Sequence, residues 1–291
     1  MTAECIVRAA SVLAEGPVWH DGHLFWVDIE RGEIHRLNPS SNARQNWRFP
    51  HRIGFAVPTA QGDFILGADA ALARLDPRSG QLTPFAQPEF EPAGNRFNDA
   101  KCDGLGRLWA GTMAVNETPG CGTLYRVHPD GRIVPMVRKV SISNGLAWSP
   151  DGRTLYHVDS PTRRVDAFDV TPTTGNLSNR RTVIQLTHGF PDGMCADASG
   201  NLWIALWGGW SVVCHDPLTG RRLAEVQVPV EAVTSCCFGD HDDLWITTAS
   251  RDLDAEGHSQ QPLAGGIFRA KVGVTGFATV PFGETSEAPT L

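Results

Sequence analysis

The sequence of 291 residues has no apolar run approaching the roughly 18 residues that a membrane-spanning helix requires. A membrane partner is therefore not expected. The N-terminal segment also lacks a basic start followed by a long apolar stretch, so we expect no secretory signal and predict a cytoplasmic location. No linker rich in Ser, Pro or Gly divides the chain, which predicts one domain over residues 1–291.

Cysteine pairs with metal-binding spacing are also absent. The seven cysteines are odd in number and form no CxxC pair, which argues against a disulfide framework and a zinc ribbon. We expect buried free thiols. The net charge is −7 and the basic residues are scattered, so the chain lacks the basic face that nucleic-acid binding needs. No nucleic-acid partner is expected, and the sequence indicates no protein partner.

What the chain does contain is a repeat. Six short apolar runs begin 40 to 47 residues apart, each preceded by a turn rich in Asp and Gly, and long helical periodicity is absent. Each unit supplies about four short strands, the content of one propeller blade. We predict an all-β, six-bladed β-propeller with four-stranded antiparallel blades, in which residues 6–13 pair beside the final strands to close the ring. A β-sandwich or a non-repeating barrel is the alternative. The runs start at Leu24, Phe64, Leu108, Leu155, Leu202 and Leu244.

Four of the six units carry a polar side chain nine to eleven residues before the apolar run: Glu15, Asn98, Asn144 and Asp192. The first strand of each propeller blade lines the central channel, so equal offsets predict equal heights around one axis. Two carboxylates and two amides gathered there would be poorly solvated, and a cation would relieve that cost. Oxygen ligands favour Ca²⁺, Mg²⁺ or Mn²⁺, and the lack of histidine at these offsets argues against a typical zinc site. Alternatively, these side chains merely bond to the inner-strand backbone.

The segments around these positions resemble the SMP-30/gluconolactonase/regucalcin family over essentially the whole chain, and the late PLAGGIF segment is similar to its bacterial sugar-lactonase branch. The segments that carry the resemblance are LAEGPVW (13–19), RFNDAKCDGLGRLWAGTM (96–113), SNGLAWSPDGRTLYHVDS (143–160) and FPDGMCADASGNLWIALWGG (190–209).

The resemblance implies a six-bladed propeller with one divalent ion on its axis. The family's metal ligands fall on Glu15, Asn144 and Asp192, and its substrate-contacting residues fall on Arg96 and Asn98. It also implies that Asp192 acts as the catalytic base. Ca²⁺ is the favoured ion, with Mg²⁺, Mn²⁺, Zn²⁺ and Fe²⁺ as alternatives.

These assignments predict a lactonase that hydrolyses a sugar (aldono) lactone to the aldonic acid. Water attacks the metal-polarised carbonyl, and Asp192 takes its proton as general base. Loops 113–122, 207–210 and 250–265 should return to the same face, so Glu117 is a weaker candidate for substrate contact. Trp207 and Trp210 are either a wall of the site or blade packing, and His258 receives no role.

Three other functions remain open at this point. A Ca²⁺-binding regulatory propeller without significant catalysis would need the metal site but not the adjacent Arg96 and Asn98. A hydrolase of other esters, such as organophosphates, would use the same metal chemistry. A propeller that only binds protein partners would leave the axial polar cluster unexplained.

Overall fold

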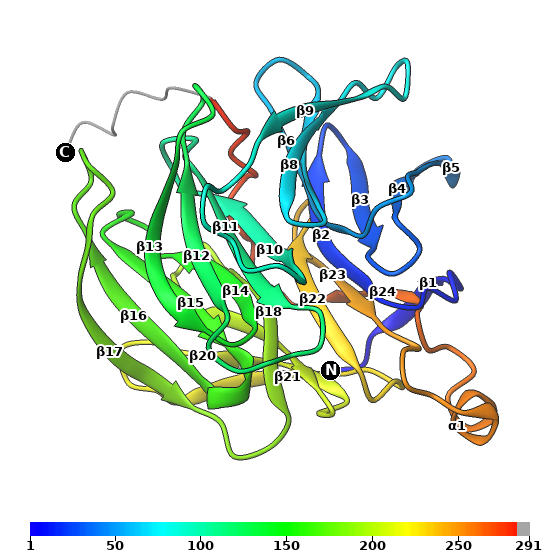
Figure 1. The fold of residues 1–291 in the computed structure, drawn as a ribbon. Coiled ribbons are helices and arrows are strands. Elements are labelled where there is room, and N and C mark those ends of the chain that lie inside the picture. Colours follow the sequence, from blue (N-terminus) through cyan, green and yellow to red (C-terminus); the bar gives the residue numbers. More distant parts are fainter. Residues whose placement is uncertain (284–291) are drawn as a thin grey trace.

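The computed structural model describes residues 1–283 of the chain, which fold into six four-stranded antiparallel sheets (Figure 1). The first strands of the sheets contact one another in a closed ring, β2–β6–β10–β14–β18–β22 and back to β2. This arrangement confirms the predicted six-bladed propeller with four-stranded antiparallel blades.

The blades follow the chain in order, numbered from the first inner strand. Blades 1 to 3 comprise β2 (Ala14–His20), β3 (His23–Asp28), β4 (Glu33–Asn38) and β5 (Ala43–Arg48); β6 (Ile53–Pro58), β7 (Phe64–Ala68), β8 (Ala71–Leu75) and β9 (Leu82–Ala86); and β10 (Asn95–Cys102), β11 (Leu108–Ala114), β12 (Gly122–Val127) and β13 (Ile133–Val140). Blades 4 to 6 comprise β14 (Ser143–Trp148), β15 (Thr154–Asp159), β16 (Arg164–Val170) and β17 (Leu177–Gln185); β18 (Phe190–Ala196), β19 (Leu202–Trp207), β20 (Ser211–His215) and β21 (Arg222–Gln227); and β22 (Val233–Phe238), β23 (Asp243–Thr248), β24 (Ile267–Lys271) and β1 (Glu4–Val7).

The N-terminal strand closes the ring, as predicted, but its position differs. β1 (Glu4–Val7) pairs antiparallel with β24, whereas the sequence predicts this pairing for residues 6–13. Only part of that range belongs to the strand, and Leu13 instead forms an isolated bridge to Ala249. The repeat predicts that the last blade takes its fourth strand from the N-terminal segment. The composition of that segment does not determine at which residue the strand begins.

The apolar runs form the second strand of every blade, and most of their residues are buried because sheets pack on both faces. The Asp–Gly turns act as expected. Between β2 and β3, Asp21 and Gly22 have φ of 48° and 69°, the left-handed pair that a tight hairpin requires. Aromatic side chains join neighbouring blades, as Phe55 and Phe97 do with ring centroids 5.9 Å apart.

Helical structure in the described residues is limited to η1 (Ser160–Thr162) and α1 (Ala255–Gln260). No helix in that part of the chain is long and apolar enough to cross a membrane.

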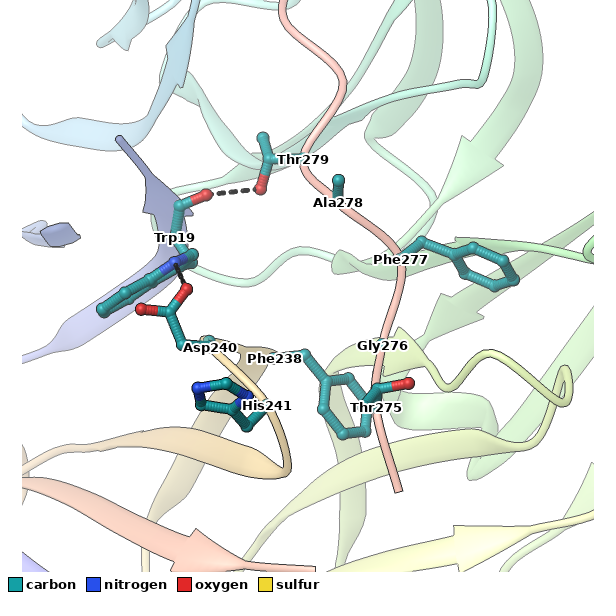
Figure 2. A pocket seen from close by; sticks show the side chains of 10 residues that line it. Trp19, Phe238, Asp240, His241, Thr275, Gly276, Phe277, Ala278 and Thr279 are labelled. Carbon is teal, nitrogen blue, oxygen red and sulfur yellow. Dashed lines mark hydrogen bonds between the residues drawn. The ribbon is translucent and has the colours of Figure 1, made fainter. Parts of the chain in front are cut away.

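Residues 272–283, which follow β24, cross one face of the ring, opposite to the face where the inner strands begin. It bonds in turn to the β18–β19 turn through Ala198, to Trp19 through the Thr279 hydroxyl, and to Pro58 through the amide of Phe282. Figure 2 shows this segment beside a cavity that Trp19 and Asp240 also line. The cavity has a volume of about 260 Å³. The segment therefore connects several blades across the far end of the channel.

Candidate metal and active site at the axial channel

The five polar side chains predicted for the inner strands gather near the start of those strands, on one face of the ring. All are buried, with only 3–7% of their surface exposed. In every blade a register shift occurs between the inner strand and its neighbour close to this end. Such bulges redirect side chains and are common beside functional sites. The five residues are Glu15 on β2, Arg96 and Asn98 on β10, Asn144 on β14 and Asp192 on β18.

Glu15 and Asp192 form the acidic centre of the site. Their carboxyl groups lie within hydrogen-bonding reach of each other. Burial, with the nearby charge of Asp99, raises the pKa of Glu15 to about 8. Burial and the charge of Glu15 also raise the pKa of Asp192 well above its ordinary value. Without a metal ion, two buried carboxyl groups so close together share at least one proton, because charging both would have a large electrostatic cost.

Asn98 connects Arg96 to Asn144. Its Nδ2 donates to Oδ1 of Asn144 at 2.7 Å and to the carbonyl of Ser143 at 2.9 Å. Its Oδ1 accepts a bond from Nη1 of Arg96 at 2.6 Å. Burial lowers the pKa of Arg96 to about 10, which leaves the guanidinium charged at neutral pH. These bonds fix the orientation of the Asn144 carboxamide. They also hold the positively charged guanidinium of Arg96 near the carboxyl group of Glu15.

Ser160 is a further buried residue of the site that the sequence pattern does not predict. Its hydroxyl accepts from Nδ2 of Asn144 at 2.8 Å and donates to the carbonyl of Pro191 at 2.6 Å. It therefore joins one predicted ligand to the backbone directly before Asp192. Ser160 begins η1, outside the inner strands, so the offset rule that found the other residues could not find it.

Asp99 is a second missed residue. It is 8% exposed, its Oδ1 accepts from the amide of Ala100 at 2.7 Å, and its charge contributes to the raised pKa of both Glu15 and Asp192. A third buried carboxyl group therefore lies within electrostatic range of the acidic centre. Its position directly after Asn98 was a usable signal, because the bulge in β10 lies between Phe97 and Ala100.

Glycine next to two of the site residues permits the close packing of inner strands. A Cβ on Gly145 would lie 2.6 Å from the carbonyl oxygen of Asp192, and one on Gly193 would lie 2.0 Å from Oγ of Ser235. Neither distance is possible for a real side chain. The glycines therefore let neighbouring inner strands approach closely at the height of the site.

The loops expected at this face are found there. Glu117 lies in the β11–β12 connection, where its carboxylate pairs with Arg251 at 2.9 Å. Trp207 ends β19 and Trp210 lies in the following turn, 39% exposed. His258 lies in α1, with Nδ1 2.9 Å from the carbonyl of Asp254. The cysteines of the inner strands are buried free thiols, as predicted: Cys102, Cys195, Cys236 and Cys237.

The residues present fit a divalent cation. Oδ1 of Asp192 is buried without a hydrogen-bond partner, an expensive arrangement that a cation would relieve. The carboxamide oxygen of Asn144 and the carboxylate of Glu15 complete a set of hard oxygen donors. Within residues 1–283 no group of three or more His, Cys, Asp and Glu side chains is arranged to hold a metal, so the candidate site depends on the asparagine.

Fold and site together define a six-bladed β-propeller with a buried acidic and carboxamide site at one end of its axial channel. Residues 13–250 match the model of the SMP-30/Gluconolactonase/LRE-like region. The chain belongs to this family.

Proteins that are similar to this chain over nearly its full length are named either as regucalcins or as a sugar lactone lactonase. Regucalcin of Xenopus laevis is 37% identical, with 96% of this chain and 97% of the relative aligned. A Bacillus subtilis protein named "Putative sugar lactone lactonase YvrE" is 35% identical, with 94% and 95% aligned. Among solved structures, a calcium-binding protein, regucalcin, from Agrobacterium tumefaciens has a TM-score of 0.91 at 28% identity, covering 97% of each chain. The similarity supports a gluconolactonase- or regucalcin-type protein.

Proposed function

We propose that the protein hydrolyses sugar (aldono) lactones to aldonic acids at the axial site, with one divalent cation held by Glu15, Asn144 and Asp192. The unpartnered, buried Oδ1 of Asp192 beside the carboxyl group of Glu15 carries this proposal. A cation there would allow both carboxylates to ionise. Ca²⁺ is the first candidate because all the donors are oxygen atoms, with Mg²⁺, Mn²⁺, Zn²⁺ and Fe²⁺ as alternatives.

When bound, the cation would supply Lewis acidity to polarise the lactone carbonyl and offset the charge that develops on its oxygen. The carboxylate of Asp192 accepts a proton from the attacking water as the new C–O bond forms. The ring C–O bond then breaks, and the proton passes to the ring oxygen, which leaves as a hydroxyl group. Water is consumed and one aldonic acid is formed.

Arg96 and Asn98 are proposed to bind the substrate's oxygen atoms. The guanidinium of Arg96 is buried beside the acidic centre and bonds to Asn98 and to the carbonyl of Phe97. A polyhydroxylated lactone would exchange its bonds to water for bonds to these fixed donors. Such a site discriminates against analogues that leave its buried donors without a hydrogen-bond partner. Glu117 remains a weaker candidate for substrate contact.

The test is a pH-indicator assay on a panel of aldonolactones, with spontaneous hydrolysis subtracted. The protein is first stripped of metal with a chelator, and then Ca²⁺, Mg²⁺, Mn²⁺, Zn²⁺ and Fe²⁺ are restored one at a time. We expect acid release only after metal is restored. Hydrolysis of no lactone with any of these ions would overturn the proposal.

A Ca²⁺-binding regulatory role is the second candidate, favoured by the regucalcin names of several relatives. It requires the cation site but no catalysis. Saturable Ca²⁺ binding without turnover of any lactone would favour this function. The buried Arg96 argues for the enzyme, because a guanidinium beside a cation site weakens cation binding unless it serves another ligand.

A further inference from the structure

Two loops from opposite blades meet over the mouth of the axial site. Residues 115–121 connect β11 to β12 in blade 3, and residues 249–266 connect β23 to β24 in blade 6. Blades 3 and 6 are three places apart in a ring of six and therefore face each other across the channel. Oε1 of Glu117 nevertheless lies 2.9 Å from Nη2 of Arg251. The ion pair thus spans the mouth.

Both partners are held in place by the backbone beneath them. Glu117 has a left-handed φ of 59°, and its amide donates to the carbonyl of Ala114 at 2.9 Å. On the other side the amide of Arg251 donates to the carbonyl of Val12 at 2.9 Å, and the hydroxyl of Ser250 donates to Ser11 at 2.8 Å. The two tips therefore present their charges toward each other from fixed positions.

The ion pair lies close to the proposed substrate side of the site. Burial is the main cause of the lowered pKa of Arg96, and the positive charge of Arg251 contributes to it, so Arg251 lies within electrostatic range of Arg96. Arg96 is only 3% exposed and Asp192 7% exposed. These side chains therefore have little surface open to solvent in the structure in which the pair is formed.

The pair is also easy to break. The side chains of Glu117 and Arg251 are 46% and 30% exposed, so water and salt screen their attraction. A contact that closes the mouth but costs little to open has the properties of a latch.

We propose that the Glu117–Arg251 ion pair is a latch across the mouth of the axial site, which opens to admit the ligand and re-forms over a lactone of monosaccharide size. A second sugar on the lactone would hold the two loops apart, so the latch selects against disaccharide lactones. The selectivity rests on the proposed lactonase function, whereas the latch itself does not.

Hydrogen–deuterium exchange of the intact, metal-free protein tests the latch without any substrate. In Glu117→Gln, the amides of residues 249–254 in the opposite loop should exchange at least about threefold faster. In Arg251→Gln, the amides of residues 115–121 should do the same. Asp169→Asn is the matched control, because it breaks a pair with Arg181 at 2.7 Å on blade 4 whose carboxylate is as exposed as that of Glu117. Faster exchange confined to the mutated loop, or found equally in the control, would overturn the latch.

Kinetics with a monosaccharide and a disaccharide aldonolactone separate the latch from direct substrate contact. Opening the latch predicts that Glu117→Gln and Arg251→Gln both raise the kcat/KM of the disaccharide lactone relative to the monosaccharide lactone, by about tenfold. The double variant should add little, and the charge exchange Glu117→Arg with Arg251→Glu should restore the original selectivity.

Two other results have distinct meanings. If Glu117 alone alters KM and Arg251→Gln changes nothing, Glu117 contacts the substrate and the latch is overturned. If no lactone is hydrolysed but each variant still loosens the opposite loop, the lactonase proposal fails and the latch stands.

Discussion

The carboxyl groups of Glu15 and Asp192, on the inner strands of blades 1 and 5, lie within hydrogen-bonding reach of each other at the axis of the propeller. Burial raises the pKa of both carboxyl groups, and the charge of Glu15 raises the pKa of Asp192 further. Oδ1 of Asp192 has no hydrogen-bond partner. This pair makes the metal-free site electrostatically unfavourable when both groups are charged.

The stability of the metal-free protein should fall as the pH rises. The pKa of Glu15 is raised from 4.5 to about 8, so the folded state retains a proton that the unfolded state releases. Stability is therefore greatest below about pH 4.5 for this group and declines until about pH 8. Denaturant unfolding in a chelator should show a loss on the order of 1–4 kcal/mol from this group.

Glu15→Gln provides the control for that pH dependence. The variant cannot ionise at this position, so its metal-free form should be more stable than the wild type near pH 8 and should lose part of the pH dependence. An unchanged slope would show that Glu15 does not hold the proton.

Ser160→Ala should weaken cation binding without removing a ligand. The hydroxyl fixes the carboxamide of Asn144 and bonds to the carbonyl of Pro191. Loss of such a supporting bond typically lowers metal affinity by about 10- to 100-fold. Calorimetric titration with Ca²⁺ measures the change. Ser160→Thr, which keeps the hydroxyl, should recover part of the affinity; equal loss in both variants would indicate a packing effect.

Gly145→Ala should destabilise the protein by about 1–3 kcal/mol, because its Cβ would lie 2.6 Å from the carbonyl oxygen of Asp192. Thermal unfolding measures the loss. Gly104→Ala is a matched control, since a Cβ there meets nothing within 4 Å. Equal stability of the two variants would contradict the close approach of the inner strands at the site.

Phe282→Ala tests the segment that crosses the far face. Phe282 is 2% exposed and packs edge-on against Phe85 at 5.9 Å, so its truncation should cost about 3–5 kcal/mol. Phe277, in the same segment but 49% exposed, should tolerate the same change with little loss. If both variants unfold at the wild-type denaturant concentration, the segment does not stabilise the ring.

The blade architecture and four inner-strand site residues could be predicted because both follow from repetition. A recurring apolar run fixes the blade, and a constant offset before it places Glu15, Asn98, Asn144 and Asp192 at one height around the axis. The structure confirms the blades and brings these four side chains together, with Arg96 bonded to Asn98. Their roles in binding and catalysis remain proposals.

The features that the sequence does not predict depend on contacts that do not recur from blade to blade. Ser160 lies in η1 and reaches Asn144 only because the second strand of blade 4 ends at the same face. The pair of Glu117 and Arg251 joins loops of opposite blades, whose lengths vary from one unit to the next. The limits of β1 also depend on its pairing with β24 and not on a local signal.

Calorimetric titration of the metal-stripped protein with Ca²⁺ at pH 7 tests the central claim most directly. The account predicts one saturable site per chain, with proton release seen as a dependence of the heat on the buffer, because Glu15 has a pKa of about 8 before binding. Asp192→Asn should lower the affinity by at least about 100-fold. Wild-type affinity in Asp192→Asn, or no saturable binding of Ca²⁺, Mg²⁺ or Mn²⁺ by the wild type, would contradict it.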